Sequence, residues 1–483
     1  MDKRLIFEKS EDGRENKLVN PPDIPLIPPE SIIPKELLRE DLPLPSLGEL
    51  DVVRHYTNLS RLNFSVDTNF YPLGSCTMKY NPKVNEDIAK LKSFTHLHPY
   101  QPENYIQGAL KVLYELEKFL CLLTGMARFS FQPPAGASGE FTGMMIIKAY
   151  HKLRKEKRYK VIIPDSSHGT NPATASMCGY KTVVVPSTKE GLVDIDNLRK
   201  LVDEETSAMM LTNPNTLGLF EERILDISEI VHSKGALLYY DGANFNALLG
   251  ITKPSLMGFD VIHLNLHKTF STPHGSGGPG AAGVGVKDEL KEFLPVPLVD
   301  TKNGRYYFNY KLKNSIGKVK AFYGNFTVLV RACAYILRLG EEGLKRVAQH
   351  SVLNANYLRE KLKDTYKLAS SNRCMHEVVL SCVWQKEKGV KAVDIAKRLI
   401  DFGIHPPTMY FPLIVKEALM IEPTETESKS TLDYFIQIMK QINDEVNSSP
   451  DNFKNYPLTT PVRRVDETYA ARFPDIRWKK SGV

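Results

Sequence analysis

The chain has 483 residues, which exceeds one typical core and predicts a large domain with a smaller one. Its apolar content of 42% and charged content of 25% are ordinary for a soluble globular protein. The net charge of +7 is spread along the chain without a sustained basic block, which argues against a nucleic-acid partner. The six cysteines form no CxxC pair, which argues against a zinc ribbon, a redox dithiol or a secreted disulfide framework.

The N-terminal residues carry acidic side chains and lack the apolar core of a secretory signal or transit peptide. No apolar run approaches the roughly 18 residues of a membrane span. We therefore expect a cytoplasmic protein without a membrane partner.

Proline punctuates residues 1–50 at eight positions, so this segment cannot form its own core and is predicted to be an extended arm. It lies either on its own domain or on a partner, and both options stay open. We predict a large domain over residues 51–330. Residues 331–483 are expected to hold bridging helices, a small C-terminal domain and a tail.

Apolar residues at helical spacing predict a helix over residues 105–123. From residue 129 onward, strand-like and helix-like segments alternate, which predicts an α/β fold with a mostly parallel sheet covered on both faces. The expected strands are 161–164, 182–186, 208–211, 236–240 and 261–264, and the expected helices end near 153, 202 and 232.

After Asn325, two helical stretches run to about residue 363 and are read as a bridge. A smaller α/β unit should follow, with strands 377–383 and 419–421 around a helix over 392–402. A last helix is predicted over 430–446, with Ser430 as its N-cap.

Small residues at 136–139 precede a predicted helix and would expose backbone N–H groups at its positive end, which is a phosphate cradle. The segment is no P-loop, because no Lys-Ser/Thr pair follows, and Glu140 breaks a GxSxG elbow. Taken alone, the segment is better interpreted as an ordinary Gly-Ser helix start.

Three further strand ends carry polar residues at the edge of a parallel sheet where ligands gather. His168 follows one strand and could lie flat on a planar ligand, although a hydrogen-bonded loop histidine is the plainer interpretation. Asn215 follows the next strand, in a turn whose amides could hold a ring substituent. Asp241 ends a hydrophobic strand, where a buried carboxylate requires a cation such as a pyridinium nitrogen.

Lys268 lies at the exit of the last strand, where a partly buried amine could form a Schiff base. A phosphate cradle, a stacking histidine, a buried aspartate and this lysine are the parts needed to hold pyridoxal phosphate. Each signal is weak by itself, but their joint order predicts that cofactor. No metal is predicted, because His96 and His98 lack a helical pair spacing and a third ligand.

Several long motifs resemble glycine decarboxylase, the P-protein of the glycine cleavage system. They are LGSCTMKYNP at 73–82, SSHGTNPA at 166–173, NLHKTF at 265–270, PHGSGGPG at 273–280, YFP at 410–412 and EPTETESK at 422–429. The resemblance covers nearly the whole chain but matches only the second, pyridoxal-phosphate-bearing half of the family's single-chain form. It therefore implies the second subunit of a split form. Small serines at 271 and 276 depart from the family's pattern without enlarging the site.

The resemblance implies a type I aminotransferase-like fold with a large mostly parallel-sheet domain and a smaller C-terminal α/β domain. It implies a heterotetramer with two copies each of subunit 1 and this chain, and a lipoylated H-protein as second substrate. Glycine would be decarboxylated, and its aminomethyl group would pass to a lipoyl sulfur. The lipoyl disulfide takes up the electrons, so no nicotinamide or flavin is required.

Carried over by position, Lys268 is the Schiff-base residue, Asp241 the partner of the ring nitrogen and His168 the stacking group. Phosphate contacts are expected from Gly136, Ala137 and Ser138, together with His267 or Thr269, and Asn215 is expected at the ring hydroxyl. The residues nominated for substrate binding are Ser75, Cys76, His98 and Tyr100. Cys76 is either a reactive thiol near the lipoyl arm or a packing residue. The glycines from 275 to 285 are read as a segment that lets backbone approach the cofactor.

Two other functions are compatible with parts of the sequence. A cysteine-desulfurase-like or aminotransferase-like activity on another small amino acid fits the same cofactor site, and substrate profiling would distinguish it. A non-catalytic scaffold would hold a catalytic partner, but the Lys268, Asp241 and His168 set argues against it.

Overall fold

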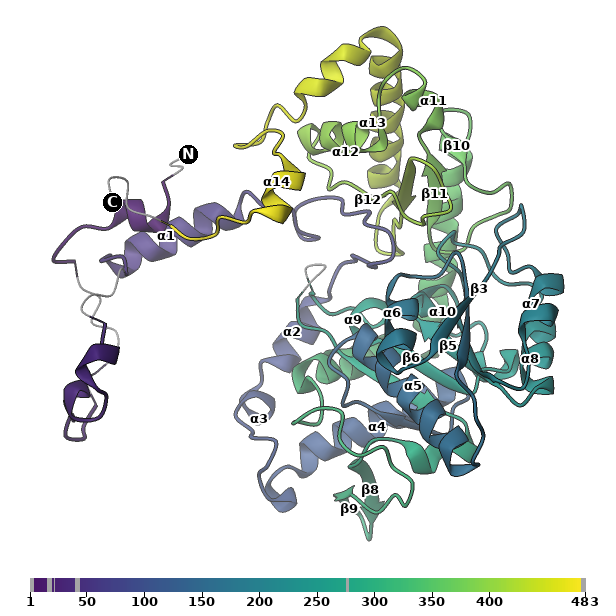
Figure 1. Cartoon of the computed structure of the whole chain (residues 1–483). Helices are drawn as coiled ribbons and strands as arrows, with labels where there is room; N and C mark the ends of the chain where they lie inside the picture. The colour runs from purple at the N-terminus through teal and green to yellow at the C-terminus, as the bar shows by residue number, and fades with distance from the viewer. Residues whose placement is uncertain (1–3, 15–19, 21, 40–43, 275–277, 479–483) are drawn as a thin grey trace. The chain divides into compact units, whose positions relative to one another are not determined.

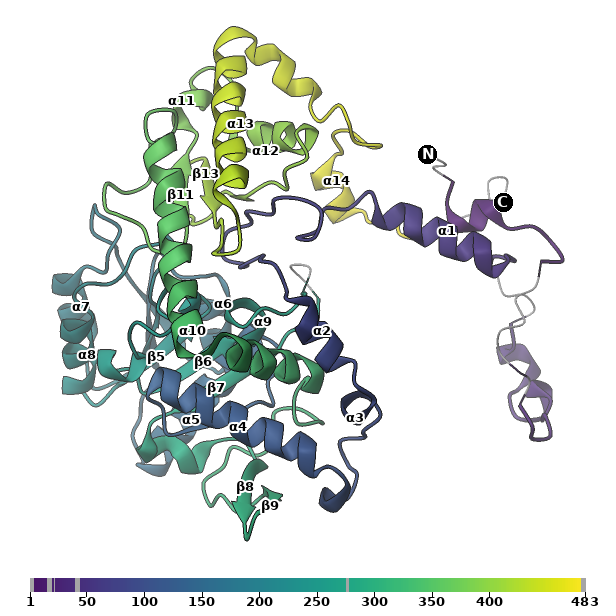
Figure 2. The same ribbon diagram turned by 180° about the vertical axis from the view of Figure 1, so that it is seen from behind.

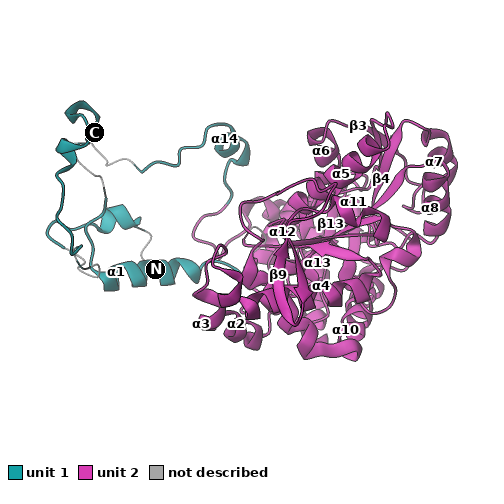
Figure 3. Cartoon of the chain, turned by 90° about the horizontal axis from the view of Figure 1, so that it is seen from below, with its two compact units in different colours: residues 1–64, 464–483 teal, residues 65–463 magenta. Residues whose placement is uncertain are grey.

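The computed structural model describes residues 4–14, 20, 22–39, 44–274 and 278–478. The chain divides into two compact units, one of residues 65–463 and one of residues 1–64 with 464–483 (Figure 3). Of the glycine-rich run, positions 275–277, including Ser276, lie outside the described residues. The domain boundaries expected at residues 50 and 330 stay a prediction.

The larger unit is built on a seven-stranded sheet with the order β1-β7-β6-β5-β4-β2-β3. Strand β7 runs antiparallel to both of its neighbours, and the other strand pairs are parallel. The strands are β1 (Arg128–Ser130), β2 (Lys160–Pro164), β3 (Lys181–Val185), β4 (Thr206–Thr212), β5 (Leu237–Gly242), β6 (Val261–Asn265) and β7 (Ala282–Val286). The predicted mostly parallel α/β sheet is confirmed.

Successive residues of the central strands point to opposite faces of the sheet, and both faces are apolar. Val161, Met210 and Val261 join one buried core with helix α5, whereas Ile162, Leu211 and Ile262 join another with helices α4, α8 and α10. Helices α5 and α6 lie in front of the sheet in Figure 1, and α10 lies in front when the chain is seen from behind in Figure 2. These helices are α4 (Gln107–Thr124), α5 (Gly136–Leu153), α6 (Thr170–Met177), α7 (Ile195–Leu201), α8 (Ile224–Ser233) and α10 (Phe326–Leu362).

Strand β7 was not predicted from sequence, because its glycines read as a loop. A Cβ atom on Gly285 would lie 2.4 Å from the ring of Phe129, so this glycine lets β7 pack against a buried aromatic side chain. A Cβ atom on Gly283 would likewise contact Phe129, at 3.3 Å. The expected close packing at Gly283 and Gly285 is therefore present, against Phe129, and the approach of their backbone to a cofactor stays a prediction. The antiparallel hairpin of β8 (Leu298–Lys302) and β9 (Arg305–Asn309) was also not predicted.

A four-stranded antiparallel sheet, in the order β10-β11-β13-β12, forms the second core of this unit. Its strands and covering helices are β10 (Lys367–Leu368), β11 (Val378–Ser381), β12 (Thr408–Met409), β13 (Ala418–Ile421), α11 (Val383–Lys386), α12 (Ala392–Asp401) and α13 (Lys429–Ser448). Helix α13 is capped by Ser428, whose side chain accepts the Thr431 N–H, so the predicted cap at Ser430 was wrong by two residues. Helix α10 breaks at Gly340, which confirms two helical stretches between the cores.

Short helices complete the larger unit and the smaller one. In the larger unit these are α2 (Lys83–Ala89), α3 (Lys92–Thr95) and α9 (Leu266–Thr269). The smaller unit holds α1 (Glu49–Ser60) and α14 (Glu467–Arg472), and the Phe7 ring stacks on Trp478 with centroids 5.0 Å apart. Among the described residues, no helix is both long and apolar enough to cross a lipid bilayer.

Candidate active site

A cavity of about 150 Å³ lies where β2, β4, β5 and β6 end. This is the edge of a parallel sheet at which ligands gather. The residues that line it come from these strand ends, from the start of α5 and from one segment near residue 75. They are Ser75, Gly136, Ala137, Glu140, His168, Thr170, Thr212, Thr216, Asp241, Ala243, Asn244, His263, Asn265 and Lys268.

Lys268 reaches this cavity from α9, a single helical turn that follows β6. Its side chain is half-buried, and its Nζ donates a hydrogen bond of 2.6 Å to the carbonyl of Ser75. The buried strand Val261–Asn265 thus fixes the backbone from which the lysine extends. The structure places Lys268 at a strand exit, as the sequence predicts.

Asp241 is the buried anion of the cavity. Its Oδ2 accepts from the Asn171 amide at 3.0 Å, and its Oδ1 accepts from the Ala243 N–H at 3.0 Å. Burial alone would raise the pKa of Asp241, but the His263 ring and these two donors hold the pKa below its ordinary value. Asp241 is therefore a carboxylate with one side open to the cavity.

Glu140 lies next to Asp241 and shares the Asn171 amide, which donates to its Oε2 at 3.0 Å. Burial, followed by the charge of Asp241, raises the pKa of Glu140 to about 7. His263 is the third member of this cluster. One carboxylate oxygen from each acid and one ring nitrogen of His263 lie within 4.8 Å of one another. Its ring contacts the Tyr239 hydroxyl and the Asn265 side chain, both at 2.7 Å.

His168 lines the cavity from the loop after β2. Its Nδ1 lies 2.9 Å from the Thr170 hydroxyl, and its ring centroid lies 5.5 Å from that of Phe411. This hydrogen bond at Nδ1 restrains the imidazole ring at the cavity that it lines. The structure therefore brings His168, Asp241 and Lys268 to one site.

The start of α5 forms the remaining wall. Gly136 and Ala137 line the cavity, and Ser138 follows in the same turn without lining it. The helix begins without a side-chain cap, and its first turn, which the structure describes in full, carries no acidic residue. Its terminal N–H groups are thus available to an anion. A Cβ atom on Gly136 would lie 2.8 Å from the Asn265 amide, so the close approach requires glycine.

Three residues expected at the cofactor lie beside the cavity rather than in its lining. The Asn215 side chain accepts from the N–H groups of Leu217 and Leu219 in its own turn and donates to the Gly191 carbonyl, 24 residues away in sequence. His267 contacts Ala281 through Nδ1 at 3.2 Å. Thr269 is buried, and its hydroxyl has no hydrogen-bond partner among the described residues.

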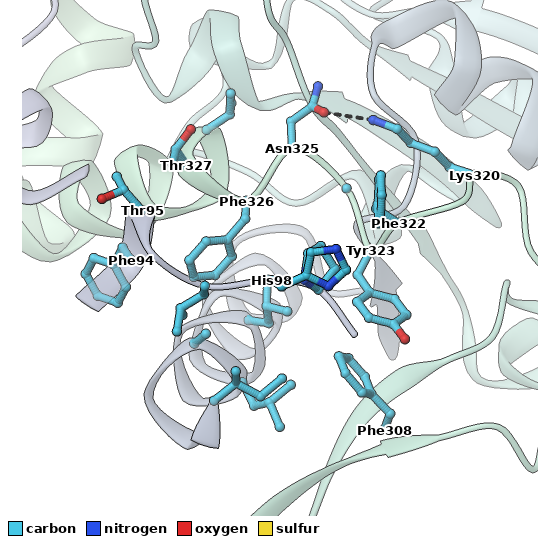
Figure 4. A pocket seen from close by; sticks show the side chains of 18 of the residues that line it. Phe94, Thr95, His98, Phe308, Lys320, Phe322, Tyr323, Asn325, Phe326 and Thr327 are labelled. Carbon is cyan, nitrogen blue, oxygen red and sulfur yellow. Dashed lines mark hydrogen bonds between the residues drawn. The ribbon is translucent and has the colours of Figure 1, made fainter. Parts of the chain in front are cut away.

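Of the four residues nominated for substrate binding, only Ser75 lines this cavity. Cys76 is half-buried beside it, and burial raises the pKa of its thiol, which disfavours a thiolate. His98 instead lines a second, aromatic cavity of about 530 Å³, together with residues such as Phe322, Tyr323 and Phe326 (Figure 4). The Tyr100 ring lies 5.8 Å from that of His98, and its hydroxyl donates to the Ala321 carbonyl.

Sequence reasoning missed Glu140, Asn171 and His263. Asn171 lies within the SSHGTNPA motif, three residues after His168, and its position there was the available signal. Glu140 follows the small residues 136–139 and His263 interrupts an apolar run, but nothing in the sequence shows that they meet Asp241. Thr212 was missed as well, although its hydroxyl is buried at the cavity and has no partner among the described residues.

Solved structures establish the fold. A structure described as glycine decarboxylase (P-protein) of the glycine cleavage system, in inhibitor-bound form, matches with a TM-score of 0.72 and 21% identity, over 85% of this chain and 94% of that chain. Lactobacillus brevis glutamate decarboxylase matches with a TM-score of 0.67 and 13% identity, over 86% and 96% of the two chains. The fold is that of type I pyridoxal-phosphate-dependent enzymes.

Sequence relatives are much closer. Residues 347–457 match the family model described as glycine dehydrogenase, C-terminal domain. A protein of Caldanaerobacter subterraneus subsp. tengcongensis is 59% identical over 99% of both chains, and one of Thermococcus onnurineus is 55% identical over 99% of this chain and 96% of that one. Both carry the name "Probable glycine dehydrogenase (decarboxylating) subunit 2". With this identity along its whole length, the chain belongs to the glycine dehydrogenase (decarboxylating) subunit 2 family.

Proposed function

We propose that this chain decarboxylates glycine with pyridoxal phosphate and passes the remaining aminomethyl group to the lipoyl disulfide of an H-protein. The observation that carries the proposal is the meeting of Lys268, Asp241 and His168 at one cavity. Family membership selects glycine among the substrates that such a site could serve.

The chemical groups that line the cavity match the parts of pyridoxal phosphate. An uncapped helix start suits a phosphate, a buried carboxylate suits a protonated ring nitrogen, and a half-buried lysine suits an aldehyde. The Thr212 hydroxyl is buried at this cavity without a partner among the described residues, as expected where a polar ligand completes the site. Lys268 would hold the cofactor, Asp241 its ring nitrogen, and the N–H groups at Gly136, Ala137 and Ser138 its phosphate.

The chemistry that pyridoxal phosphate supplies when bound is an aldehyde that joins to amines and a ring that accepts the electrons of a departing carboxylate. Asp241 would keep a proton on the ring nitrogen, because the Asn171 and Ala243 donors hold this carboxylate in its charged form. His168 would cover one face of the ring and exclude water from it. Lys268 would give up its bond to the Ser75 carbonyl when it joins the cofactor and return to it when glycine takes its place.

The other nominated roles remain predictions. His267 or Thr269 at the phosphate requires a side-chain rotation, since the structure places neither in the lining. Asn215 at the ring hydroxyl would have to leave its turn. Ser75 is the nominated substrate residue with direct access to the cavity, whereas Cys76, His98 and Tyr100 would act from outside its lining.

The relatives' name describes a subunit, which supports assembly with a second kind of chain. We propose two copies of each subunit, with the lipoylated H-protein as the acceptor of the aminomethyl group. The cytoplasmic location expected from the sequence stays a prediction.

The test compares wild type, Lys268→Ala and the control Lys253→Ala, which removes an exposed lysine of the same unit. Wild type and Lys253→Ala should show the visible absorption band of a lysine-bound cofactor, and Lys268→Ala should not. Glycine-dependent exchange of bicarbonate should require this chain, its partner subunit and lipoylated H-protein together.

Two results would contradict the proposal. A cofactor band retained by Lys268→Ala would remove this lysine from its role. Full exchange by this chain alone would refute the need for a partner subunit.

A further inference from the structure

The segment from Leu73 to Met78 connects the small sheet with the cavity through a strained turn. Leu73 pairs with Ile421 at the end of β13, and the turn then reaches Ser75 at the cavity wall. Ser75 and Thr77 have φ angles of 63° and 50°, in a region that residues other than glycine rarely adopt. Backbone of this kind persists only where its surroundings hold it.

Two fully buried glutamates hold this turn from the small sheet. Glu377, which precedes β11, accepts from the Ser75 N–H at 3.1 Å. Glu422, which follows β13, accepts from the Thr77 N–H at 2.9 Å and from its hydroxyl at 2.7 Å. Both glutamates have no exposed surface, so each bond is made away from water.

The same turn contacts the lysine of the active site. Ser75 gives its N–H to Glu377, and its carbonyl accepts from Lys268 Nζ at 2.6 Å. The next carbonyl of the turn, that of Cys76, is also held, because the His274 Nε2 atom lies 3.1 Å from it. The position of the carbonyl that receives Lys268 therefore depends on the two glutamates.

The two glutamates form a cluster with His376. One carboxylate oxygen from each glutamate and one ring nitrogen of His376 lie within 4.8 Å of one another. Two buried carboxyl groups this close do not both ionise. Glu422 accepts three donors, from Thr77 and Asn246, which favours its charged form. Glu377 accepts one, and its Oε1 has no partner among the described residues, so Glu377 is the member that keeps the proton.

The other charged groups near the cluster agree with this assignment. Burial, and then the charge of Glu422, raises the pKa of Glu377 well above its ordinary value. Burial also raises the pKa of Glu422, but less far, because the Thr77 donors and the charge of Lys268 oppose it. Burial, with the charge of Lys268, lowers the pKa of His376 to about 3, so its ring is neutral at pH 7. Glu425 is paired with Lys79 at 2.7 Å, and the Cys76 thiol stays protonated. The cluster thus presents one negative charge to the Lys268 amine.

We propose that Glu377 and Glu422 are positioning residues for Lys268, which together hold one proton and one negative charge and fix the Ser75–Thr77 turn. The Ser75 carbonyl then receives the lysine amine whenever the amine is not joined to the cofactor. This inference rests on the proposed function only in taking Lys268 as the residue that bears the cofactor.

The test measures capture of pyridoxal phosphate by the full chain freed of cofactor, as the growth of the visible band over a range of pH. Glu422→Gln should lower the maximum rate about tenfold or more, because the turn loosens. It should also move the midpoint of the pH dependence of capture to lower pH, because the negative charge of the cluster is removed. Glu377→Gln should keep the midpoint and stay within about threefold of the wild-type rate, because an amide replaces a neutral carboxyl group.

Glu221→Gln is the matched control. Glu221 is also buried and accepts one backbone N–H, from Val193 at 2.9 Å. It lies between β4 and α8 of the seven-stranded sheet, and its hydrogen bond is not to the Ser75–Thr77 turn. Its rate and midpoint should equal those of wild type. Thr77→Val removes only the hydroxyl donor to Glu422, and should slow capture without moving the midpoint. This variant keeps the test decisive if Glu422→Gln folds poorly.

Equal rates and midpoints in Glu422→Gln and Glu221→Gln would overturn the proposal, as would a wild-type rate in Thr77→Val. A midpoint shift in Glu377→Gln as large as that in Glu422→Gln would overturn the assignment of the proton. Absence of capture by wild type would refute the proposed function and this inference with it, whereas slow capture confined to the variants refutes neither.

Discussion

Two buried clusters of acidic side chains flank Lys268 and differ in what their negative charge faces. In the first, Asp241 lies beside Glu140 and His263, and all three line the cavity. In the second, Glu422 lies beside Glu377 and His376, and its charge faces the Ser75–Thr77 turn. The first cluster is placed to act on a ligand directly, and the second acts through backbone.

The clusters also differ in how their two carboxyl groups are connected. The Asn171 amide bridges the first pair, donating to Glu140 and to Asp241 at 3.0 Å each. The second pair is connected through the turn, since Ser75 binds one glutamate and Thr77 the other. A change of charge should therefore affect chemistry in the first cluster, and geometry and stability in the second.

The largest effect is expected from Asp241→Asn. A neutral amide cannot hold a proton on a ring nitrogen, so kcat should fall at least about 10²-fold. Asp194→Asn is the control, because Asp194 caps the distant helix α7 and asparagine caps equally well. Rates of glycine-dependent exchange provide the measurement, and a loss of less than about threefold in Asp241→Asn would show that the first cluster does not act by charge.

Glu422→Ala should be the most destabilising change in the second cluster. It leaves the Thr77 N–H and hydroxyl buried without an acceptor, so the free energy of unfolding should fall by about 3 kcal/mol. Urea unfolding measures this loss, with Glu387→Ala, an exposed glutamate of the same small core, as a control that changes little. A small loss of unfolding free energy in Glu422→Ala would mean that the hydrogen bonds to Glu422 do not stabilise the turn.

Glu140→Gln should change how stability depends on pH. Because burial and then Asp241 raise the pKa of Glu140 to about 7 from its ordinary 4.5, the folded protein holds this proton more tightly than the unfolded chain. The stability from this group is full below pH 4.5 and is lost as pH rises to about 7. Relative to wild type, Glu140→Gln should thus gain about 2–3 kcal/mol between these two pH values.

Glu221→Gln separates the effect of a raised glutamate pKa from the effect of the bridge to Asp241. Burial raises the pKa of Glu221 to about 7 as well, so its glutamine variant should show a similar pH-dependent gain in unfolding experiments. Only Glu140→Gln should also shift the pH profile of glycine exchange, since only Glu140 is bridged to Asp241. Identical activity profiles for the two variants would contradict that coupling.

The sheet and the three main site residues could be predicted because their signals are local. Apolar runs mark β2, β4, β5 and β6, and His168, Asp241 and Lys268 lie where such runs end, so the parallel topology alone brings them together. Strand β7 was not predicted because its glycines are required by the close packing of the Phe129 ring, and the sequence does not show that contact.

The residues that hold the site in place could not be predicted, because their partners are distant in sequence. Thr77 and Glu422 are 345 residues apart, and Ser75 and Glu377 are 302 apart. A buried glutamate next to a strand end has no local pattern that separates it from a surface residue. Asn215 is the opposite case, a residue that the sequence placed at the ligand. The same amide that could bind a ligand instead accepts the backbone N–H groups of Leu217 and Leu219 in its own turn.

The smallest effect is expected from Ser75→Gly, which tests whether the strain of the turn serves Lys268. Glycine adopts the φ of 63° without a Cβ clash, so this change should raise the free energy of unfolding by about 1 kcal/mol. Lys155→Gly is the matched control, because Lys155 has a φ of 60° at the exposed end of α5. Both variants should be stabilised alike in urea, but only Ser75→Gly should slow the capture of pyridoxal phosphate, since a freer turn no longer fixes the carbonyl that receives the lysine. Equal capture by both variants would mean that the strain is unrelated to Lys268, and the second cluster would then be a stabilising contact alone.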